Sequence, residues 1–285
     1  MRKRMIHRKL PLLAAVTFAA TSPLSAQQIP DPPKLLRIFR EHVKEGRRAA
    51  HQKTEIRYAQ AMARAKYPAN YFALVSMTGP SEVWFMEAQD SFASLAETEA
   101  FSDKPALQAE MDTLDAQDAE FRSGSSTWIM AYRGDLSYRV AELTKGLPKT
   151  RYFNVIVFHV HQNRDTEFAE LGKTANAALE KGGVAQPSMV YQVISGAASG
   201  TYVLFEPMTS LKALDDAPAR GRAMFEAMGE SGMKRFENAA SEIIAGSEPR
   251  LFVINPKMSY VPSHFASGDP EFWAPKPPAA KTPAK

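Results

Sequence analysis

The chain has 285 residues, of which 45% are hydrophobic and 23% charged, and it contains no cysteine. This composition is typical of a globular protein with a sizeable core, and the missing thiols exclude cysteine nucleophiles, thiolate metal sites and iron–sulfur clusters. The formal net charge of +4 belongs to the N-terminus, because residues 1–26 hold five basic residues and no acid, so the rest carries −1. We therefore expect no nucleic-acid partner, which would need a basic face.

The first 26 residues have the three parts of a secretory signal peptide. A basic stretch (MRKRMIHRK) precedes an apolar run (LPLLAAVTFAA) and a small-residue segment (TSPLSA) that ends at Ala26. The apolar run is short for a membrane span, and no second long apolar run follows. We expect an exported protein of bacterial type, periplasmic or secreted after cleavage near Ala26, with no transmembrane segment in the mature chain. An uncleaved anchor is the alternative.

Residues 35–140 predict one β-α-β-β-α-β unit. Hydrophobic alternation indicates the first strand, and a run of helix formers without Pro or Gly indicates the first helix. The predicted elements are a strand over 35–43, a helix over 47–66, hairpin strands over 71–77 and 82–87, helices over 91–100 and 106–121, and a strand over 126–132.

Residues 150–261 predict the same order again, after a linker over 134–148. The predicted elements are a strand over 151–161, a helix over 165–181, hairpin strands over 189–195 and 201–206, a short helix from Ser210, one helix or two broken near Gly229/Gly232 over 222–245, and a strand over 250–255. Residues 262–285 are rich in Pro and Lys and predict a disordered tail. Phe265, Phe272 and Trp273 could pin its start to the body.

The two units also correspond residue by residue. Residues 71–97 align with 190–216 without a gap, at an offset of 119. Four positions in this alignment are identical: Ser76/Ser195, Glu87/Glu206, Ser91/Ser210 and Leu95/Leu214. The pair His42-Val43 recurs as His159-Val160 at an offset of 117, and Leu136-Ser137-Tyr138 is matched by Met258-Ser259-Tyr260 at 122. This pattern predicts an internal repeat.

Two such units in one chain resemble the dimeric α+β barrel superfamily, which includes antibiotic-biosynthesis-monooxygenase-like, NIPSNAP-like and chlorite dismutase proteins. The resemblance covers roughly residues 35–260 and rests on element order and repeat register. It implies an α+β fold in which two tandem ferredoxin-like repeats form an intrachain barrel with its helices outside. The space between the two sheets is either a cavity or a packed core, and the sequence leaves both open.

Candidate catalytic residues lie at the ends of the first strand of each unit. Alternation puts Arg40 and His42 on one face of their strand, and His159 and His161 on the matching face of theirs. If this face points into the barrel, the imidazoles could act as acids or bases and the guanidinium could hold an anion. The alternative is a set of half-solvated polar strand ends. We predict no metal here, because metal sites usually bring carboxylates or a third imidazole.

His51 and Glu55 are one helical turn apart and could both ligate a metal. No H-E-x-x-H pattern surrounds them, which favours a surface pair.

Aromatic residues on the hairpin strands suggest a ligand, with Tyr71, Trp84, Tyr191 and Tyr202 as lining candidates. We expect a protein that binds a small apolar or aromatic molecule between the sheets, with the cofactor-independent monooxygenase activity that the resemblance implies and no bound cofactor. Two alternatives remain: a non-catalytic envelope or interaction module with a filled barrel, and a haem protein of the chlorite dismutase type with an axial histidine. The sequence does not decide whether the chain is an enzyme, and a monomer or a homodimer is compatible with it.

Overall fold

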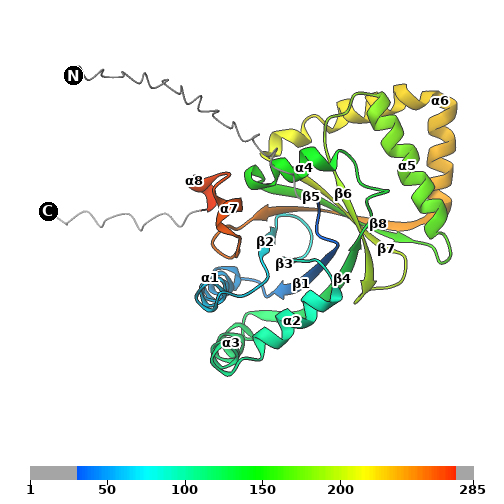
Figure 1. Cartoon of the computed structure of the whole chain (residues 1–285). Helices are drawn as coiled ribbons and strands as arrows, with labels where there is room; N and C mark the ends of the chain where they lie inside the picture. Colours follow the sequence, from blue (N-terminus) through cyan, green and yellow to red (C-terminus); the bar gives the residue numbers. More distant parts are fainter. Residues whose placement is uncertain (1–30, 274–285) are drawn as a thin grey trace, which may run out of the picture.

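A computed structural model describes residues 31–273, so the predicted leader and residues 274–285 of the predicted tail lie outside the described residues. Eight antiparallel strands close a barrel in the order β1-β3-β2-β8-β5-β7-β6-β4 (Figure 1). The pairs β2–β8 and β4–β6 join the two halves of the chain. The barrel therefore closes within one chain, and no second copy is needed to complete it.

In the N-terminal half the elements are β1 (Leu35–Val43), α1 (Arg48–Ala65), β2 (Tyr71–Ser76), β3 (Glu82–Gln89), α2 (Phe92–Ser102), α3 (Pro105–Asp118) and β4 (Arg122–Tyr132). In the C-terminal half they are α4 (Val140–Gly146), η1 (Leu147–Lys149), β5 (Tyr152–Val160), α5 (Asp165–Lys181), β6 (Met189–Ser195), β7 (Thr201–Met208), η2 (Leu211–Leu214), α6 (Ala217–Ile243), β8 (Ile244–Ile254), α7 (Ser263–Ala266) and α8 (Pro270–Trp273).

Local signals explain several of these boundaries. The Ser91 hydroxyl accepts a hydrogen bond from the Ser94 amide at 3.1 Å, while Ser94 Oγ accepts one from the Ser91 amide, so a reciprocal cap opens α2. Helix α6 is interrupted at Gly229, which has φ 71° and ψ 164°. Glycine takes this conformation without steric cost, and the predicted break lies here.

The segment predicted as a linker contains a helix, α4, which the interval 134–148 did not predict. The predicted disordered tail is also wrong for residues 262–273, which form α7 and α8. The physical reason is aromatic burial: the Phe72 ring lies 5.3 Å from the ring of Phe265 and 5.8 Å from that of Trp273, and the Trp273 indole N–H donates to the Pro148 carbonyl at 2.7 Å.

The central strands β1 and β5 have matching partners. Strand β1 pairs with β3 and β4, with Arg40 opposite Trp84 and Ser126, and β5 pairs with β7 and β8, with Val157 opposite Val203 and Glu248. Each strand also has a register shift near its end, between His42 and Val43 and between His159 and Val160. The paired positions correspond at the offsets seen in the sequence. Arg40 and Val157 are 117 residues apart, Trp84 and Val203 are 119 apart, and Ser126 and Glu248 are 122 apart.

Inward-facing side chains from both halves fill the barrel. They belong to one buried cluster that includes Trp84, Met130, Phe153, Phe205 and Phe252, of which each is 0% exposed. Outward-facing side chains pack under helices, with α1, α2 and α3 on one side of the barrel and α5 and α6 on the other (Figure 1). Most of the space between the sheets is therefore a packed core rather than an open cavity. Within residues 31–273, no helix combines the length and hydropathy that crossing a membrane requires.

Replacing Gly196 should open the seam between β4 and β6. A Cβ atom at Gly196 would lie 2.0 Å from the Thr127 carbonyl oxygen, and its φ is +95°. We expect Gly196→Ala to lower the free energy of unfolding by roughly 3 kcal/mol, the sum of left-handed strain and a backbone shift. Urea denaturation measures this loss.

Gly79→Ala is the matched control, because Gly79 has φ +73° but nothing within 4 Å of its added Cβ. It should lose about 1 kcal/mol from strain alone. Equal losses in the two variants would mean that close approach of β4 to β6 contributes nothing to stability.

Candidate functional site

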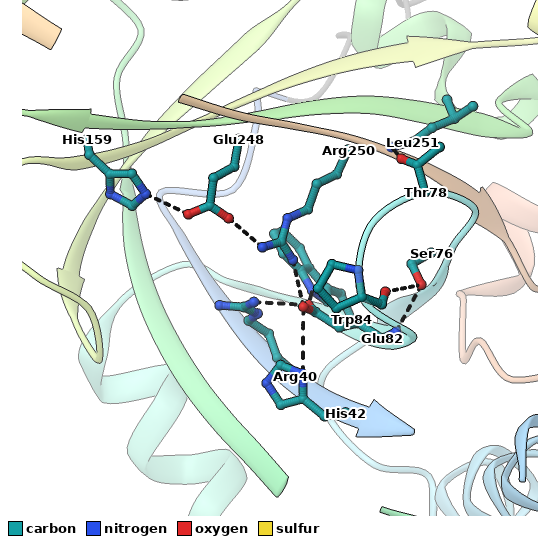
Figure 2. Close-up of polar contacts among 11 residues, drawn as sticks. Arg40, His42, Ser76, Thr78, Glu82, Trp84, His159, Glu248, Arg250 and Leu251 are labelled. Atoms are coloured by element: carbon teal, nitrogen blue, oxygen red, sulfur yellow. Dashed lines mark hydrogen bonds and ion pairs between the residues drawn. The ribbon is translucent and has the colours of Figure 1, made fainter. Parts of the chain in front are cut away.

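A buried carboxylate organises one end of the barrel interior (Figure 2). The Glu82 side chain is 1% exposed and accepts hydrogen bonds from Arg40 at 2.9 Å, from the Trp84 indole at 2.6 Å and from Arg250 at 2.6 Å. Strand register explains the meeting: Glu82 and Trp84 are two residues apart on the inner face of β3, and Trp84 lies opposite Arg40 on β1. Arg250 lies on β8, in the C-terminal half of the chain.

The network continues to the second predicted strand end. Arg250 also pairs with Glu248, whose other oxygen lies 2.8 Å from His159 Nε2, and His42 Nδ1 lies 3.6 Å from Glu82 (Figure 2). The Arg40 guanidinium carbon is 4.1 Å from the centre of the Trp128 ring and 4.8 Å from that of Trp84. These are cation–π distances.

Three of the four predicted catalytic residues, Arg40, His42 and His159, therefore meet in this network. His161 does not: it is exposed one residue beyond the end of β5, and no described side-chain hydrogen bond joins it to the others. Sequence reasoning missed Glu82, Glu248 and Arg250. The signal was present, because charged residues at inward positions of a closed barrel must be paired.

The electrostatics of Glu82 indicate a structural role. Burial alone would raise the pKa of its carboxyl, but the hydrogen bonds from Trp84 and Arg40, together with the Arg250 charge, hold the pKa below its usual value. None of the three cavities described below is lined by Arg40, Glu82 or Arg250. The network closes one end of the barrel and lines none of these cavities.

The first cavity lies outside the barrel, between the strands of the N-terminal half and helices α1, α2 and α3. It has a volume of about 320 Å³ and combines aromatic and charged walls. Its lining is Arg37, Phe39, Glu41, Glu55, Tyr58, Met62, Tyr67, Tyr71, Phe85, Glu87, Glu99, Ser102, Asp115 and Thr127. Outward positions of β1 and β3 supply its floor.

Ionisable groups at the two ends of this cavity are in different states. At one end, Arg37 pairs with Glu87 at 2.9 Å and with Glu99, and it donates to the Tyr67 hydroxyl at 3.1 Å. At the other end, burial and the charges of Glu41 and Asp118 raise the pKa of Glu55 well above its usual value. This shift favours the protonated form of the Glu55 carboxyl.

Tyrosine hydroxyls in the same cavity also remain protonated. Burial, followed by the nearby carboxylates, raises the pKa values of Tyr58 and Tyr71. The cavity thus offers several hydrogen-bond donors against the rings of Phe39 and Phe85.

The four predicted lining residues do not share a pocket between the sheets. Trp84 and Tyr191 point inward and are 0% exposed in the core. Tyr71 and Tyr202 point outward, where Tyr71 lines the first cavity and Tyr202 packs on Phe168 of α5 at 4.5 Å between ring centres. The prediction of one lining is wrong because the alternation of the strands divides these residues between the two faces.

Two further cavities are largely apolar. One, of about 320 Å³, lies under α5 and α6 and is lined by residues such as Leu136, Phe158 and Leu171. The other, of about 280 Å³, lies at the barrel end near α7, where Tyr71 and Tyr191 both contribute to its wall. No histidine lines any of these three cavities, so a histidine-ligated haem does not fit them.

The predicted surface pair of His51 and Glu55 is wrong, because both side chains are buried. They lie with Glu41 and Asp118 in a group whose ligand atoms are all within 4.8 Å of one another. The sheet lies over this face of α1, which the helical spacing could not indicate. These are the described residues most suited to hold a cation.

Comparisons with known proteins give distant structural likenesses. No protein-family profile matches the sequence, and no curated protein does. The fold is similar to an inferred monooxygenase from Lactobacillus acidophilus NCFM (8% identity, 77% of this chain and 93% of that chain, TM-score 0.46). It is also similar to an anthrone oxidase-like protein (11%, 78% and 92%, 0.47) and to chlorite dismutase from Candidatus Nitrospira defluvii (8%, 79% and 92%, 0.44).

Replacing Glu82 should destabilise the barrel more at neutral pH than in acid. Glu82→Gln leaves Arg40 and Arg250 buried without their shared counter-charge, which costs about 3–5 kcal/mol of unfolding free energy. The folded pKa of Glu82 is lowered, so its stabilisation is present above the unfolded value of about 4.3 and is lost as the pH falls through the folded value. The difference in unfolding free energy between wild type and Glu82→Gln should therefore be smaller at pH 3 than at pH 7, as measured by denaturant unfolding.

Glu248→Gln is the control, since its side chain is 45% exposed and its loss should cost at most about 1 kcal/mol. If the difference in unfolding free energy between wild type and Glu82→Gln did not change with pH, Glu82 would not be a paired, ionised carboxylate.

Proposed function

We propose that this protein binds a small, flat organic molecule in the cavity between the outer face of β1 and β3 and helices α1 to α3. One observation carries the proposal: a single cavity combines an aromatic floor, Phe39 and Phe85, with polar groups from Tyr58, Tyr71 and Glu55. Burial raises the pKa of the Glu55 carboxyl, which favours its hydrogen-bond-donating form. A cavity with apolar walls and a few converging polar groups of shifted pKa is the usual form of a ligand site.

The donors of the cavity define the chemistry of the ligand. Tyrosine hydroxyls and a protonated carboxyl donate hydrogen bonds, so they favour a carbonyl or enolate oxygen on the bound molecule. Rings stacked on Phe39 and Phe85 favour an aromatic body. An aromatic ketone combines both features.

The same donors support oxidation of the ligand without a cofactor as a second candidate. Donors aimed at an enolate oxygen stabilise the carbanion form, as a neutral carboxylic acid does in an oxyanion hole. That carbanion supplies its electrons to dioxygen: a methylene carbon loses two hydrogens, gains one oxygen atom as a carbonyl, and the second oxygen atom leaves as water.

A bulky residue at the rim of the cavity should abolish binding. Ser102 ends α2 and lines the cavity, so Ser102→Trp would fill it, whereas Ser102→Ala removes only a hydroxyl. With anthrone, an enolisable three-ring ketone, as probe, we expect saturable binding by wild type and Ser102→Ala. Ser102→Trp should weaken it by at least about tenfold, or 1.4 kcal/mol. Calorimetric titration measures the affinity, and oxygen consumption with the same three proteins tests the oxidation.

Equal binding by Ser102→Trp and Ser102→Ala would put the ligand elsewhere and overturn the proposed site. Binding by none of them would favour the non-catalytic interaction module. Binding without oxygen consumption would remove the oxidation and leave the binding proposal in place.

We also propose that the protein is exported and cleaved near Ala26. The support is the three-part pattern of residues 1–26, which lie outside the described residues. Expressed in a bacterial host with its leader, the chain should be recovered from the periplasm or medium with the intact mass of residues 27–285. A full-length mass in the cytoplasm would contradict export.

We further infer that the two halves are tandem ferredoxin-like repeats, over 35–140 and 150–261. The matched pairings of β1 and β5 and their equivalent register shifts support this. Superposition of the two halves in a crystal of the protein should bring His42 onto His159. A superposition that aligns other residues would refute the inferred register.

A further inference from the structure

A second group of charged residues is buried on the opposite side of the sheet from Glu82. Glu41 comes from β1, His51 and Glu55 from α1, and Asp118 from the end of α3, and their exposed fractions are 3%, 1%, 5% and 0%. His51 Nε2 lies 2.7 Å from a Glu41 oxygen and 3.7 Å from an Asp118 oxygen. Sequence-distant elements thus bring one imidazole and three carboxyl groups to one point.

Several of these polar atoms have no hydrogen-bond partner. Glu55 Oε1 and both carboxyl oxygens of Asp118 are buried without a hydrogen bond. Arg122 Nε lies 2.8 Å from Asp118 Oδ2, but the two atoms do not meet the geometry of a hydrogen bond. Buried oxygens are nearly always paired, and these residues each offer a ligand atom within 4.8 Å of the others, so the unpartnered oxygens indicate a missing partner.

Charge identifies the kind of partner. Three carboxylates face one guanidinium, that of Arg122, whose Nη1 lies 2.9 Å from Glu41 Oε1. Bound as a metal ligand, His51 is neutral. When all three carboxyl groups are deprotonated to act as ligands, a divalent cation brings the sum of the group to zero.

The spacing fits one ion. Ligand atoms on opposite sides of a metal are separated by twice the metal–oxygen or metal–nitrogen distance of about 2.0–2.4 Å. The four ligand atoms lie within 4.8 Å of one another, which is the upper limit of that span. His51 Nε2 lies closer to its neighbours, at 2.7 Å from a Glu41 oxygen and 3.7 Å from an Asp118 oxygen. Imidazole favours zinc and iron, and carboxylates favour manganese, so the mixed set suits a divalent first-row transition metal.

We propose that Glu41, His51, Glu55 and Asp118 bind one divalent first-row transition metal ion. Glu41 and Glu55 also line the first cavity, so an open coordination position would face that cavity. There the ion would act as a Lewis acid toward an oxygen of a bound molecule. In the metal-bound protein the ion, and not a Glu55 proton, would meet that oxygen. The metal site goes beyond the proposed function, and its test does not depend on it.

The test is metal binding by purified protein that carries no affinity tag and has been stripped with a chelator. Titration with Mn²⁺ and with Zn²⁺ in a calorimeter should give one saturable site per chain, and native mass spectrometry should find a single bound ion. Carboxyl groups must lose their protons to bind, so the titration should release protons, measured by repeating it in buffers of different ionisation enthalpy.

Glu55→Gln is the decisive variant. It keeps the shape of a residue whose Oε1 makes no hydrogen bond, so the metal-free protein should unfold at the same urea concentration as wild type. Its metal affinity should fall by at least about 100-fold through the loss of a ligand. Asp115→Asn is the matched control: this carboxylate also pairs with Arg122 but is 64% exposed and outside the group, and its affinity should change by less than about threefold.

Three results would overturn the proposal: no saturable binding of either ion, equal affinity in wild type and Glu55→Gln, or loss of affinity in Asp115→Asn as large as in Glu55→Gln. Because no organic ligand is present, these results are separate from the outcome of the anthrone titration.

Discussion

A closed barrel covered by helices leaves its strands with two buried faces, and every charged group on either face must find a partner. Arg40 and Glu41 are consecutive residues of β1, so their side chains point to opposite sides of the sheet. Arg40 enters the barrel and meets Glu82, while Glu41 turns outward and meets His51. The alternation of one strand thus supplies both charged clusters of the N-terminal half.

The two clusters differ in how completely they are satisfied. Inside the barrel, the Glu82 carboxylate has two arginines and an indole, and these contacts join β1, β3 and β8. The Arg250 contact spans the two halves, so the network holds the barrel together at one end. Outside the barrel, three carboxyl groups share one arginine and leave oxygens unpaired. Unpaired buried polarity costs stability, and such a cost is commonly kept where a ligand or reaction uses it.

The two halves share strand pairings but not the character of the space under their helices. Under α1 to α3 the wall contains carboxylates, an arginine and three tyrosines, whereas under α5 and α6 it is mostly aliphatic and phenyl groups. Equivalent positions of the backbone therefore carry different chemistry. Similar topology sets where a cavity forms, and side chains set what it does.

The sequence by itself determined the eight strands of the barrel, most of the helices and their order, but not α4, α7 or α8. Alternation predicted β1 over 35–43, and helix formers bounded by Asp165 and Gly182 predicted α5 over 165–181. It also predicted that Arg40, His42, His159 and His161 would lie at one end of the barrel if their strand faces pointed inward, and His161 is the one that does not join the others. The predicted strands and helices follow from short-range periodicity, which acts within one element.

Tertiary structure decided which face of each element is buried and against what. Tyr71 and Tyr202 lie outside the barrel and Trp84 and Tyr191 inside it, because strand register selects the face. His51 and Glu55 resembled a solvated helical pair, and the packing of α1 on β1 and the approach of α3 buried them beside Glu41 and Asp118. Residues 262–273 resemble a polar tail in sequence, but Phe265 and Trp273 pack against Phe72 at the end of the barrel. Residues that contact each other but lie far apart in the chain produce no periodic pattern in the sequence. Only the closed fold shows that they are neighbours.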